Sequence, residues 1–332
     1  MDDSNYNANA TSPPAESTIG LQDVLFNIAI GFIGAIGIIG NGTVCFVIVK
    51  VKSMRTATNI LILNQSILDL TISLVFVLSY LGPTIDPLSD TFRETVFCKF
   101  WLSLYPLWSL FDSSSLNLVA ITFERYFAIV HPVMHHNKFK GSGVRGVIAA
   151  IWLSGFSIEW FWPYVHFIDN GVCTNHFNDK HLERFVGLMV FFVEYLFPMT
   201  VFIYCYVKIF IVLRTRVKEH ATNTVASNQG STYTKASQNV TKTLCVVVIT
   251  YFVCWTVPSL AYFQNWVFGG PLDWNGAFYK FTVLSVFCNV CCNPIIYGLI
   301  WEHFRKALKQ VFACKKSNKI SPEQSVATVT RA

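Results

Sequence analysis

The stretch NLVAITFERYFAIVHP, residues 117–132, decides how the rest of the chain is interpreted. A long apolar segment ends there in an acid, an arginine and an aromatic residue, Glu124, Arg125 and Tyr126, where the sequence becomes polar. Ionisable residues at the edge of a membrane helix are costly, and they therefore indicate a function. Three residues are a short motif, however, and the flanking charges of an ordinary helix end give the same pattern. The choice between the two interpretations depends on the remaining sequence.

The composition indicates a membrane protein. Of the 332 residues, 53% are hydrophobic and only 13% are charged, whereas soluble domains carry about a quarter charged residues. The net charge of +6 follows from an uneven distribution of basic residues and does not indicate a nucleic-acid partner. No cleavable signal peptide is evident in the polar, acidic N-terminus, so we expect the first membrane helix to direct insertion.

Seven apolar segments have the length of a membrane-spanning helix, about 20 residues. They are residues 24–49, 60–81, 100–130, 144–167, 185–213, 244–267 and 277–300. Pro106 interrupts the third segment and predicts a kink there. The polar residues 215–239 are rich in Ser, Thr, Asn and Gly and predict a flexible cytoplasmic loop.

The basic residues predict the orientation of this all-α, seven-helix bundle. With the N-terminus outside, 20 of the 25 Lys and Arg residues lie on the cytoplasmic side, and the outer side receives five together with eleven acids. The positive-inside rule therefore favours an outer N-terminus and a cytoplasmic C-terminus. The predicted parts are an extracellular disordered tail, the seven-helix domain, an amphipathic helix on the membrane surface and a cytoplasmic tail: residues 1–22, 23–300, 301–314 and 315–332.

Both tails carry candidate modification sites. Asn9 begins an Asn-Ala-Thr sequon and is a predicted glycosylation site. In residues 301–314 the apolar side chains fall on one side and most basic ones on the other, which is typical of an interfacial helix, and Cys314 is a predicted palmitoylation site. Membrane lipid is therefore an expected partner. The Ser and Thr residues of the C-terminal tail are candidate phosphorylation sites.

Two of the ten cysteines predict a disulfide bond. Cys98 and Cys173 are the only ones in outward-facing, oxidising positions. Their bond would attach the second outer loop to the top of the third helix. Seven other cysteines lie in apolar segments as small packing residues, and no cysteine spacing resembles a zinc site.

A group of polar residues lies within the apolar segments. Asp69 shares this property with Asn41, Ser114, Asn289 and Asn293. Each of them needs a hydrogen-bond partner. A shared water or cation site would satisfy them together, and independent hydrogen bonds between helices are the alternative.

The sequence resembles the rhodopsin-like class of G-protein-coupled receptors from about residue 24 to residue 314. The motifs of the class stand in order: Gly40-Asn41; Leu68-Asp69 with Asn64 before it; Glu124-Arg125-Tyr126; Trp152; Pro198 with Tyr206; Cys254-Trp255; and Asn293-Pro294-Ile295-Ile296-Tyr297 followed by Phe304. Together they are highly specific.

The resemblance implies a mechanism. A ligand on the outer side would shift a two-state helix bundle with Trp255 near its pivot. Arg125 would leave Glu124, meet Tyr206 and Tyr297, and open a cytoplasmic cleft for a heterotrimeric G protein. Asp69, Ser114, Asn289 and Asn293 would bind an allosteric sodium ion that favours the inactive packing, with no other metal or cofactor. A receptor kinase and arrestin would be further partners.

Three departures from the class pattern affect this expectation. Pro258 follows Trp255 by three residues instead of the usual two, which leaves the register of the kink open. The spacing from Cys98 to Arg125 is two residues longer than the common one. Ser237 occupies a position of the sixth helix that is often acidic, so that helix would give Arg125 no ionic partner. Raised basal activity is the corresponding hypothesis.

Two substitutions exclude ligand types within this resemblance. Leu107 stands where amine receptors place an aspartate, and Phe287 stands where light-sensing members place a lysine. What remains is three acids within the apolar segments, Asp112, Glu159 and Glu194, which cannot all stay ionised without a counter-charge. We expect them to bind a cationic group of a peptide ligand. Protonated carboxyl groups that bond to neighbours, or a proton sensor that includes His166 and His176, are the alternatives.

Aromatic residues are concentrated at the outer ends of the helices. They are Trp101, Tyr105, Trp108, Trp160, Trp162, Tyr164, Tyr262 and Trp266. Interfacial belts explain many of them, and a peptide pocket lined by Trp101, Leu107, Trp108 and Tyr262 would use others. We therefore predict a plasma-membrane neuropeptide receptor and no enzyme. A lipid or small-molecule ligand, constitutive activity, or a seven-helix transporter are the alternatives.

Overall fold

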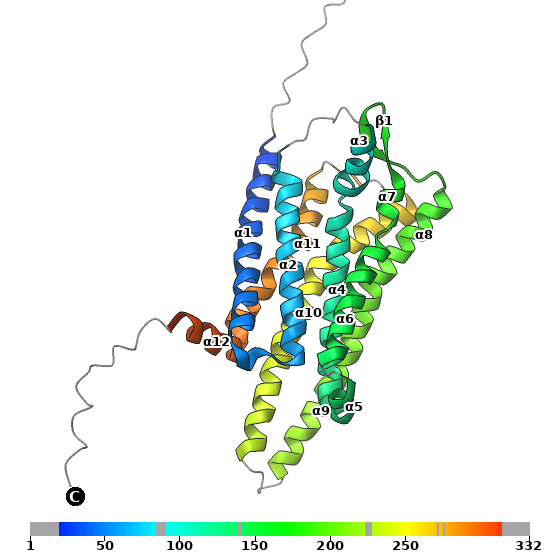
Figure 1. Ribbon diagram of the computed structural model, residues 1–332. Coiled ribbons are helices and arrows are strands. Elements are labelled where there is room, and N and C mark those ends of the chain that lie inside the picture. Colours follow the sequence, from blue (N-terminus) through cyan, green and yellow to red (C-terminus); the bar gives the residue numbers. More distant parts are fainter. Residues whose placement is uncertain are drawn as a thin grey trace, which may run out of the picture.

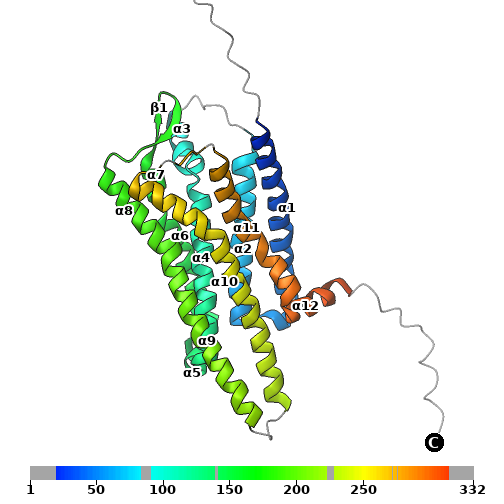
Figure 2. The ribbon, with the colours of Figure 1, turned by 180° about the vertical axis from the view of Figure 1, so that it is seen from behind.

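The helices form one bundle of long, roughly parallel rods (Figure 1). The computed structural model describes residues 20–83, 91–138, 141–222, 228–270, 272–274 and 276–313. The predicted sites Asn9 and Cys314 and the C-terminal tail lie outside these residues. Seen from behind, α11 lies between α10 and α1 (Figure 2).

The long helices are α1 (Leu21–Lys50), α2 (Ala57–Leu81), α4 (Tyr105–Val130), α6 (Gly141–Ile158), α9 (Phe197–Thr222), α10 (Asn228–Phe268) and α11 (Ala277–Ile300). The shorter ones are η1 (Lys52–Met54), α3 (Thr91–Phe97), η2 (Cys98–Leu102), α5 (Pro132–Lys138), α7 (Phe161–Val165), α8 (Lys180–Val190), η3 (Phe191–Leu196) and α12 (Glu302–Ala313). Two antiparallel strands, β1 (His166–Asp169) and β2 (Val172–Asn175), form a hairpin with His166 opposite Asn175.

Six of the described helical segments are long and apolar enough to cross a membrane. They are Leu21–Lys50, Ala57–Leu81, Ser142–Val165, Lys180–Arg216, Gln238–Phe268 and Ala277–Ile300. The remaining long helix, α4, has 26 residues and is therefore about 39 Å long, enough to span a bilayer. Its buried Asp112, Asn117 and Glu124 lower the apolar content of this segment.

The third predicted segment is broken rather than kinked. Leu104 adopts a left-handed conformation with φ of 58°, and α4 begins only at Tyr105, with Pro106 in its first turn. A proline is tolerated there because the first N–H groups of a helix have no intrahelical acceptor. The prediction of a kink within a continuous helix was therefore wrong.

The predicted flexible loop of residues 215–239 is largely helical. Helix α9 continues to Thr222, and α10 begins at Asn228. Extending a formed helix avoids the cost of nucleation. The polar composition of these residues indicates exposure to water, and it was wrongly taken to indicate a loop.

The hairpin ends the fourth predicted segment early. The predicted helix extends to residue 167, but α6 ends at Ile158, α7 ends at Val165 and β1 begins at His166. The predicted disulfide joins Cys98 of η2 to Cys173 of β2, with 5.5 Å between their Cα atoms. It holds the hairpin at the outer end of the bundle.

Three prolines leave backbone carbonyl groups that side chains of neighbouring helices satisfy. A proline has no N–H to donate to the carbonyl four residues earlier. The Glu194 carbonyl, opposite Pro198, accepts a bond from the Tyr251 hydroxyl at 2.6 Å. The Cys254 carbonyl (opposite Pro258) accepts one from Ser285 at 2.9 Å, and the Val290 carbonyl (opposite Pro294) one from Asn41 at 3.2 Å. These bonds tie η3 to α10, α10 to α11 and α11 to α1.

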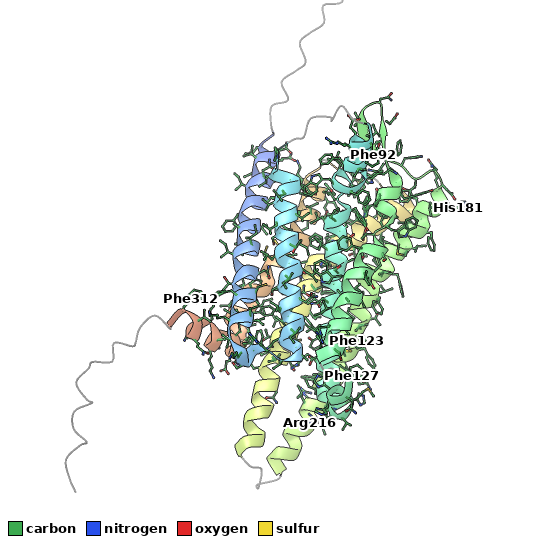
Figure 3. The ribbon with its side chains drawn as sticks, viewed as in Figure 1. Phe92, Phe123, Phe127, His181, Arg216 and Phe312 are labelled. Atoms are coloured by element: carbon green, nitrogen blue, oxygen red, sulfur yellow. A yellow bond between two sulfur atoms is a disulfide. The ribbon has the colours of Figure 1, made fainter. Side chains whose placement is uncertain are left out.

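The cytoplasmic end of α11 turns sharply into α12. Trp301 and Phe304 are buried there and stack with ring centroids 5.8 Å apart. The basic residues Arg305, Lys306 and Lys309 are exposed. Figure 3 shows Phe312 at the far end of α12, away from the bundle, and its side chain is exposed. The helix thus has the predicted amphipathic form.

Candidate functional site

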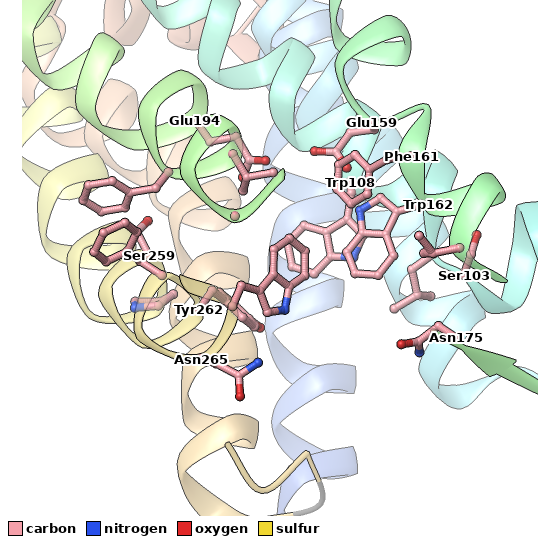
Figure 4. A pocket seen from close by; sticks show the side chains of 18 of the residues that line it. Ser103, Trp108, Glu159, Phe161, Trp162, Asn175, Glu194, Ser259, Tyr262 and Asn265 are labelled. Carbon is pink, nitrogen blue, oxygen red and sulfur yellow. The ribbon is translucent and has the colours of Figure 1, made fainter. Parts of the chain in front are cut away.

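A cavity of about 450 Å³ lies in the outer half of the bundle. Of the predicted pocket residues, Trp108, Glu159, Glu194 and Tyr262 line it. Leu107 is buried in the core, and neither Leu107 nor Trp101 of η2 is among the described residues that line the cavity. Figure 4 shows Glu159 and Glu194 pointing toward one another at one end of the cavity, beside the ring of Trp108.

Three carboxyl groups lie together here: Glu159 and Glu194 line the cavity, and Asp112 adjoins them but is not among the described residues that line it. One carboxylate oxygen from each of Asp112, Glu159 and Glu194 lies within 4.8 Å of the other two. Asp112 and Glu159 are only 4% and 2% exposed. Among the described residues, Oδ2 of Asp112 and Oε2 of Glu159 have no hydrogen-bond partner. Such a cluster either holds protons or binds a cation, because three neighbouring carboxylates cannot all be charged without compensation.

Local features of two helices bring these acids together. A Cβ on Gly155 of α6 would lie 2.1 Å from Oγ of Ser113, so only glycine permits this close approach to α4. Glu159 lies four residues after Gly155, and Asp112 immediately precedes Ser113. Glu194 lies in η3, a π-helical turn between α8 and α9. Such turns insert an extra residue and are frequent at functional sites.

The wall of the cavity is aromatic. Trp108 contacts Tyr262 edge-on at 6.4 Å between ring centroids, and Trp162 contacts Trp266 at 5.8 Å. His166 also lines the cavity, and its Nδ1 lies 2.8 Å from the Trp162 carbonyl oxygen. Burial lowers the pKa of His166 below its usual value, and the bond to Trp162 opposes this shift. At neutral pH the imidazole therefore adds no positive charge to the acidic end.

Trp255 connects the cavity to the centre of the bundle. It lines the cavity, is buried, and stacks on Tyr251 with ring centroids 5.4 Å apart. Phe111 of α4 contacts the same indole edge-on at 5.8 Å. A ligand that displaces Trp255 would therefore move α10 relative to α4.

Asp69 lies at the centre of a second polar cluster, in the middle of the bundle. Its Oδ1 accepts bonds from Ser114 at 2.9 Å and from Gln65 at 3.0 Å, and its Oδ2 accepts one from Asn293 at 2.8 Å. Oδ1 of Asn293 and Nδ2 of Asn289 are buried without a partner among the described residues. The cluster presents carboxylate, hydroxyl and amide oxygens, the donor types that hard cations prefer. These residues thus fit a sodium ion.

Glu124 and Arg125 form a third polar group, at the cytoplasmic end of α4. Nε of Arg125 lies 2.7 Å from Oε2 of Glu124, and a second guanidinium nitrogen lies 3.0 Å from Oε1. Thr58 donates to Oε2 at 2.9 Å, and Nε2 of His135 lies 2.7 Å from Oε1. Glu124 is fully buried. Its carboxylate therefore holds Arg125 and also joins α2 and α5 to α4.

The remaining predicted activation residues lie in α4, α9 and α11. Tyr126 lies 3.4 Å from His131 through its hydroxyl. Tyr297 of α11 is fully buried, and its hydroxyl has no partner among the described residues. Tyr206 of α9 and Pro294 of α11 also face the interior. Arg125 stays with Glu124, which is the arrangement expected of the resting state.

Sequence reasoning missed three members of these clusters. Gln65 bonds Asp69 from one helical turn away, and its place in an apolar segment was an available signal. Thr58 and His135 lie near helix ends, where polar residues are ordinary and carry no signal of their own. Only the folded arrangement of α2 and α5 around Glu124 reveals their role.

The part of the chain that matches known proteins includes the cavity acids, the Asp69 cluster and the Glu124–Arg125 pair. The model of the family "7 transmembrane receptor (rhodopsin family)" matches residues 40–297. Galanin receptor type 1 of Rattus norvegicus is 28% identical over 94% of this chain and 90% of its own length. Somatostatin receptor type 5 of Bos taurus is 27% identical over 93% and 82%, respectively. The substance-K receptor of Mus musculus is 28% identical over 94% and 81%.

Proposed function

The chain belongs to the rhodopsin family of seven-transmembrane receptors, and from this premise we propose that a basic side chain of its peptide ligand binds Asp112, Glu159 and Glu194. The family confirms the predicted receptor class, the seven-helix fold and the location in the plasma membrane. It is a family of signalling receptors and not of enzymes. The three relatives named above are neuropeptide receptors, and the protein accordingly is a peptide receptor that couples to a G protein.

The observation that carries the proposal is the meeting of three carboxyl groups within 4.8 Å of one another beside the cavity, with Asp112 and Glu159 buried and Glu194 partly buried. A guanidinium or ammonium group would supply the missing positive charge. Arginine suits the site better than lysine, because its five donors can bond several carboxylate oxygens at once. The unpartnered oxygen of Glu159 is an acceptor on a residue that lines the cavity, and the adjoining Asp112 adds negative charge.

The aromatic wall and the outer surface favour the same ligand. Trp108 and Tyr262 provide ring faces for a cation or for an aromatic residue of the peptide. The eleven acids on the outer side would attract a basic peptide and increase its rate of association. The cavity volume of about 450 Å³ suits the end of a peptide, with the rest of the ligand outside.

The test compares basic and neutral forms of one activating peptide, found by screening a peptide library in cells that express the receptor. Asp112→Asn and Glu194→Gln should each reduce the potency of the basic peptide about 10- to 100-fold, as expected for a lost bond to a charged group. They should change the potency of its citrulline form much less. Glu183→Gln serves as the control, because Glu183 lines the cavity outside the acidic cluster. Equal losses for both peptide forms would contradict the proposal.

A lipid or a small molecule is the alternative ligand within the same class. It would activate the receptor without a basic group, and the three acids would then hold protons. Activation by an uncharged lipid that is unchanged by Glu194→Gln would favour this alternative. Basal signalling without any ligand would indicate the constitutive alternative.

We also propose the activation and regulatory roles that the family implies. Arg125 leaves Glu124 for Tyr206 and Tyr297 when the cytoplasmic cleft opens. Asp69, Ser114, Asn289 and Asn293 bind sodium in the resting state, a proposal supported by the unpartnered Oδ1 of Asn293. A receptor kinase would act on the Ser and Thr residues of the C-terminal tail and allow arrestin to bind. The exposed Phe312 supports contact of α12 with membrane lipid.

A further inference from the structure

One side chain of α10 bonds both helices at the cytoplasmic corner between α11 and α12. Nδ2 of Asn239 donates to the carbonyl oxygen of Ile300 at 3.1 Å, and Oδ1 of Asn239 accepts from the backbone N–H of Glu302 at 2.9 Å. Ile300 is the last residue of α11, and Glu302 is the first residue of α12. Helix ends leave carbonyl and N–H groups without intrahelical partners. A single amide therefore satisfies one group of each kind.

From this geometry we infer that Asn239 is a positioning residue for G-protein activation. Its two hydrogen bonds, called the Asn239 bridge below, hold the cytoplasmic part of α10 against the α11–α12 corner. The bridge favours the resting arrangement of the bundle and limits basal signalling.

The corner is a rigid place to attach a moving helix. Trp301 and Phe304 are 1% and 2% exposed. Tyr297 contacts Trp301 edge-on, with 5.7 Å between the ring centroids. The two views in Figures 1 and 2 agree that α10 passes beside the start of α12. Displacement of α10 away from the corner therefore breaks both bonds of the bridge together.

The bridge takes the place of an ion pair that this chain cannot form. Ser237 carries no charge, so it offers Arg125 no ionic partner from α10. Arg125 is held by Glu124 of its own helix. Opening the cytoplasmic cleft requires α10 to separate from its neighbours, and Asn239 provides a polar connection that opposes this movement. Ser237 alone would predict raised basal activity, and the Asn239 bridge reduces it.

The first test removes the amide. Asn239→Ala should increase basal G-protein signalling per receptor at the cell surface about 5- to 30-fold, the shift expected from losing two hydrogen bonds. Asn239→Asp retains the acceptor for Glu302 and loses the donor for Ile300, so its increase should be smaller. Gln238→Ala, which removes an amide from the adjacent residue, is the control. The increase should disappear when Arg125→Ala is added.

The second test removes the same bond from the other side. Glu302→Pro eliminates the N–H that Asn239 accepts from, and a proline is tolerated at the first position of a helix. The preceding Trp301 already has the extended conformation that a following proline requires, with φ −82° and ψ 99°. Glu302→Ala is the matched control, because it removes the carboxylate and keeps the N–H.

Both tests predict increased signalling, whereas a purely structural role predicts fewer receptors and no gain per receptor. Basal signalling per surface receptor should be higher for Glu302→Pro than for Glu302→Ala. The increase caused by Glu302→Pro should be smaller when Asn239→Ala is already present, because both changes remove the same hydrogen bond. Signalling of Asn239→Ala no higher than that of Gln238→Ala would overturn the inference, as would equal signalling of the two Glu302 variants. Basal signalling needs no ligand, so this test is independent of the proposed peptide contacts.

Discussion

The hydroxyl of Tyr251 donates to the backbone carbonyl of Glu194 over 2.6 Å. This bond links the acidic end of the cavity to the helix that carries Trp255, because Tyr251 also stacks on Trp255. The carbonyl is available because Pro198, four residues later, has no N–H. A cation that binds Glu194 can therefore influence α10 through a direct contact.

Tyr251→Phe should weaken this connection while keeping the stacked ring. The variant leaves the partly buried carbonyl of Glu194 without this donor, which costs about 1 kcal/mol. We expect a lower melting temperature of the purified receptor and a reduced maximal response to agonist. Tyr164→Phe is the control, because the side chain of Tyr164 is 59% exposed and is not among the described residues that line the cavity. Equal melting temperatures for the two variants would contradict the assigned role of the bond.

The pH dependence of agonist potency distinguishes a cation site from a proton sensor. Lowering the pH from about 8 to about 5.5 adds protons to this cluster, because its three carboxylates lie within 4.8 Å and repel one another, and a basic peptide then loses part of its attraction to Asp112, Glu159 and Glu194. Potency should therefore fall as the external pH falls. Burial lowers the pKa of His166, so its imidazole gains a positive charge at a lower pH than an ordinary histidine does, and that charge would weaken binding further.

The matched variants for the pH experiment separate these groups. The double change Asp112→Asn with Glu194→Gln should flatten the curve, whereas His166→Asn should leave most of its slope. A response that increases with acidity in the absence of peptide would instead support the proton-sensor alternative.

The fold was predictable from the sequence to the extent that it depends on hydropathy and charge. Apolar length located the helices, and the distribution of Lys and Arg predicted their orientation. The break at Leu104 was not predictable, because a left-handed leucine has no sequence signal. The helical continuation of residues 215–222 was missed because polar composition reports exposure to water and not backbone conformation.

The sites were predictable where a polar residue lies in an apolar segment. Burial makes such a residue costly, so Asp69, Asp112 and Glu194 could be selected without a structure. Asn239 could not, because it lies in a polar stretch and its role depends on the position of the α11–α12 corner. The sequence therefore identified polar residues whose burial costs free energy, and the structure identified the helices that such residues connect.

Thr58→Val should raise basal signalling by loosening Glu124. Thr58 donates to the same Oε2 that holds Arg125, and valine has nearly the same shape without the hydroxyl. A lost bond to a charged group should shift the resting equilibrium about tenfold. Signalling per surface receptor measures the effect, and Thr71→Val is the control, because Thr71 bonds only a carbonyl of its own helix among the described contacts. Identical basal signalling in the two variants would contradict this role of Thr58.

Asp69→Asn should abolish the effect of sodium on agonist binding. Sodium at Asp69 favours the resting bundle, so agonist affinity of the unchanged receptor should fall when sodium replaces choline at constant ionic strength, which keeps screening equal. Asparagine removes the charge and preserves the size of the side chain, so the affinity of this variant should not respond. Asp112→Asn is the matched control, because it removes another buried acid of the bundle and leaves Asp69 with Ser114 and Asn293. Loss of the sodium response in Asp112→Asn, with its retention in Asp69→Asn, would place the ion at the acidic end of the cavity instead.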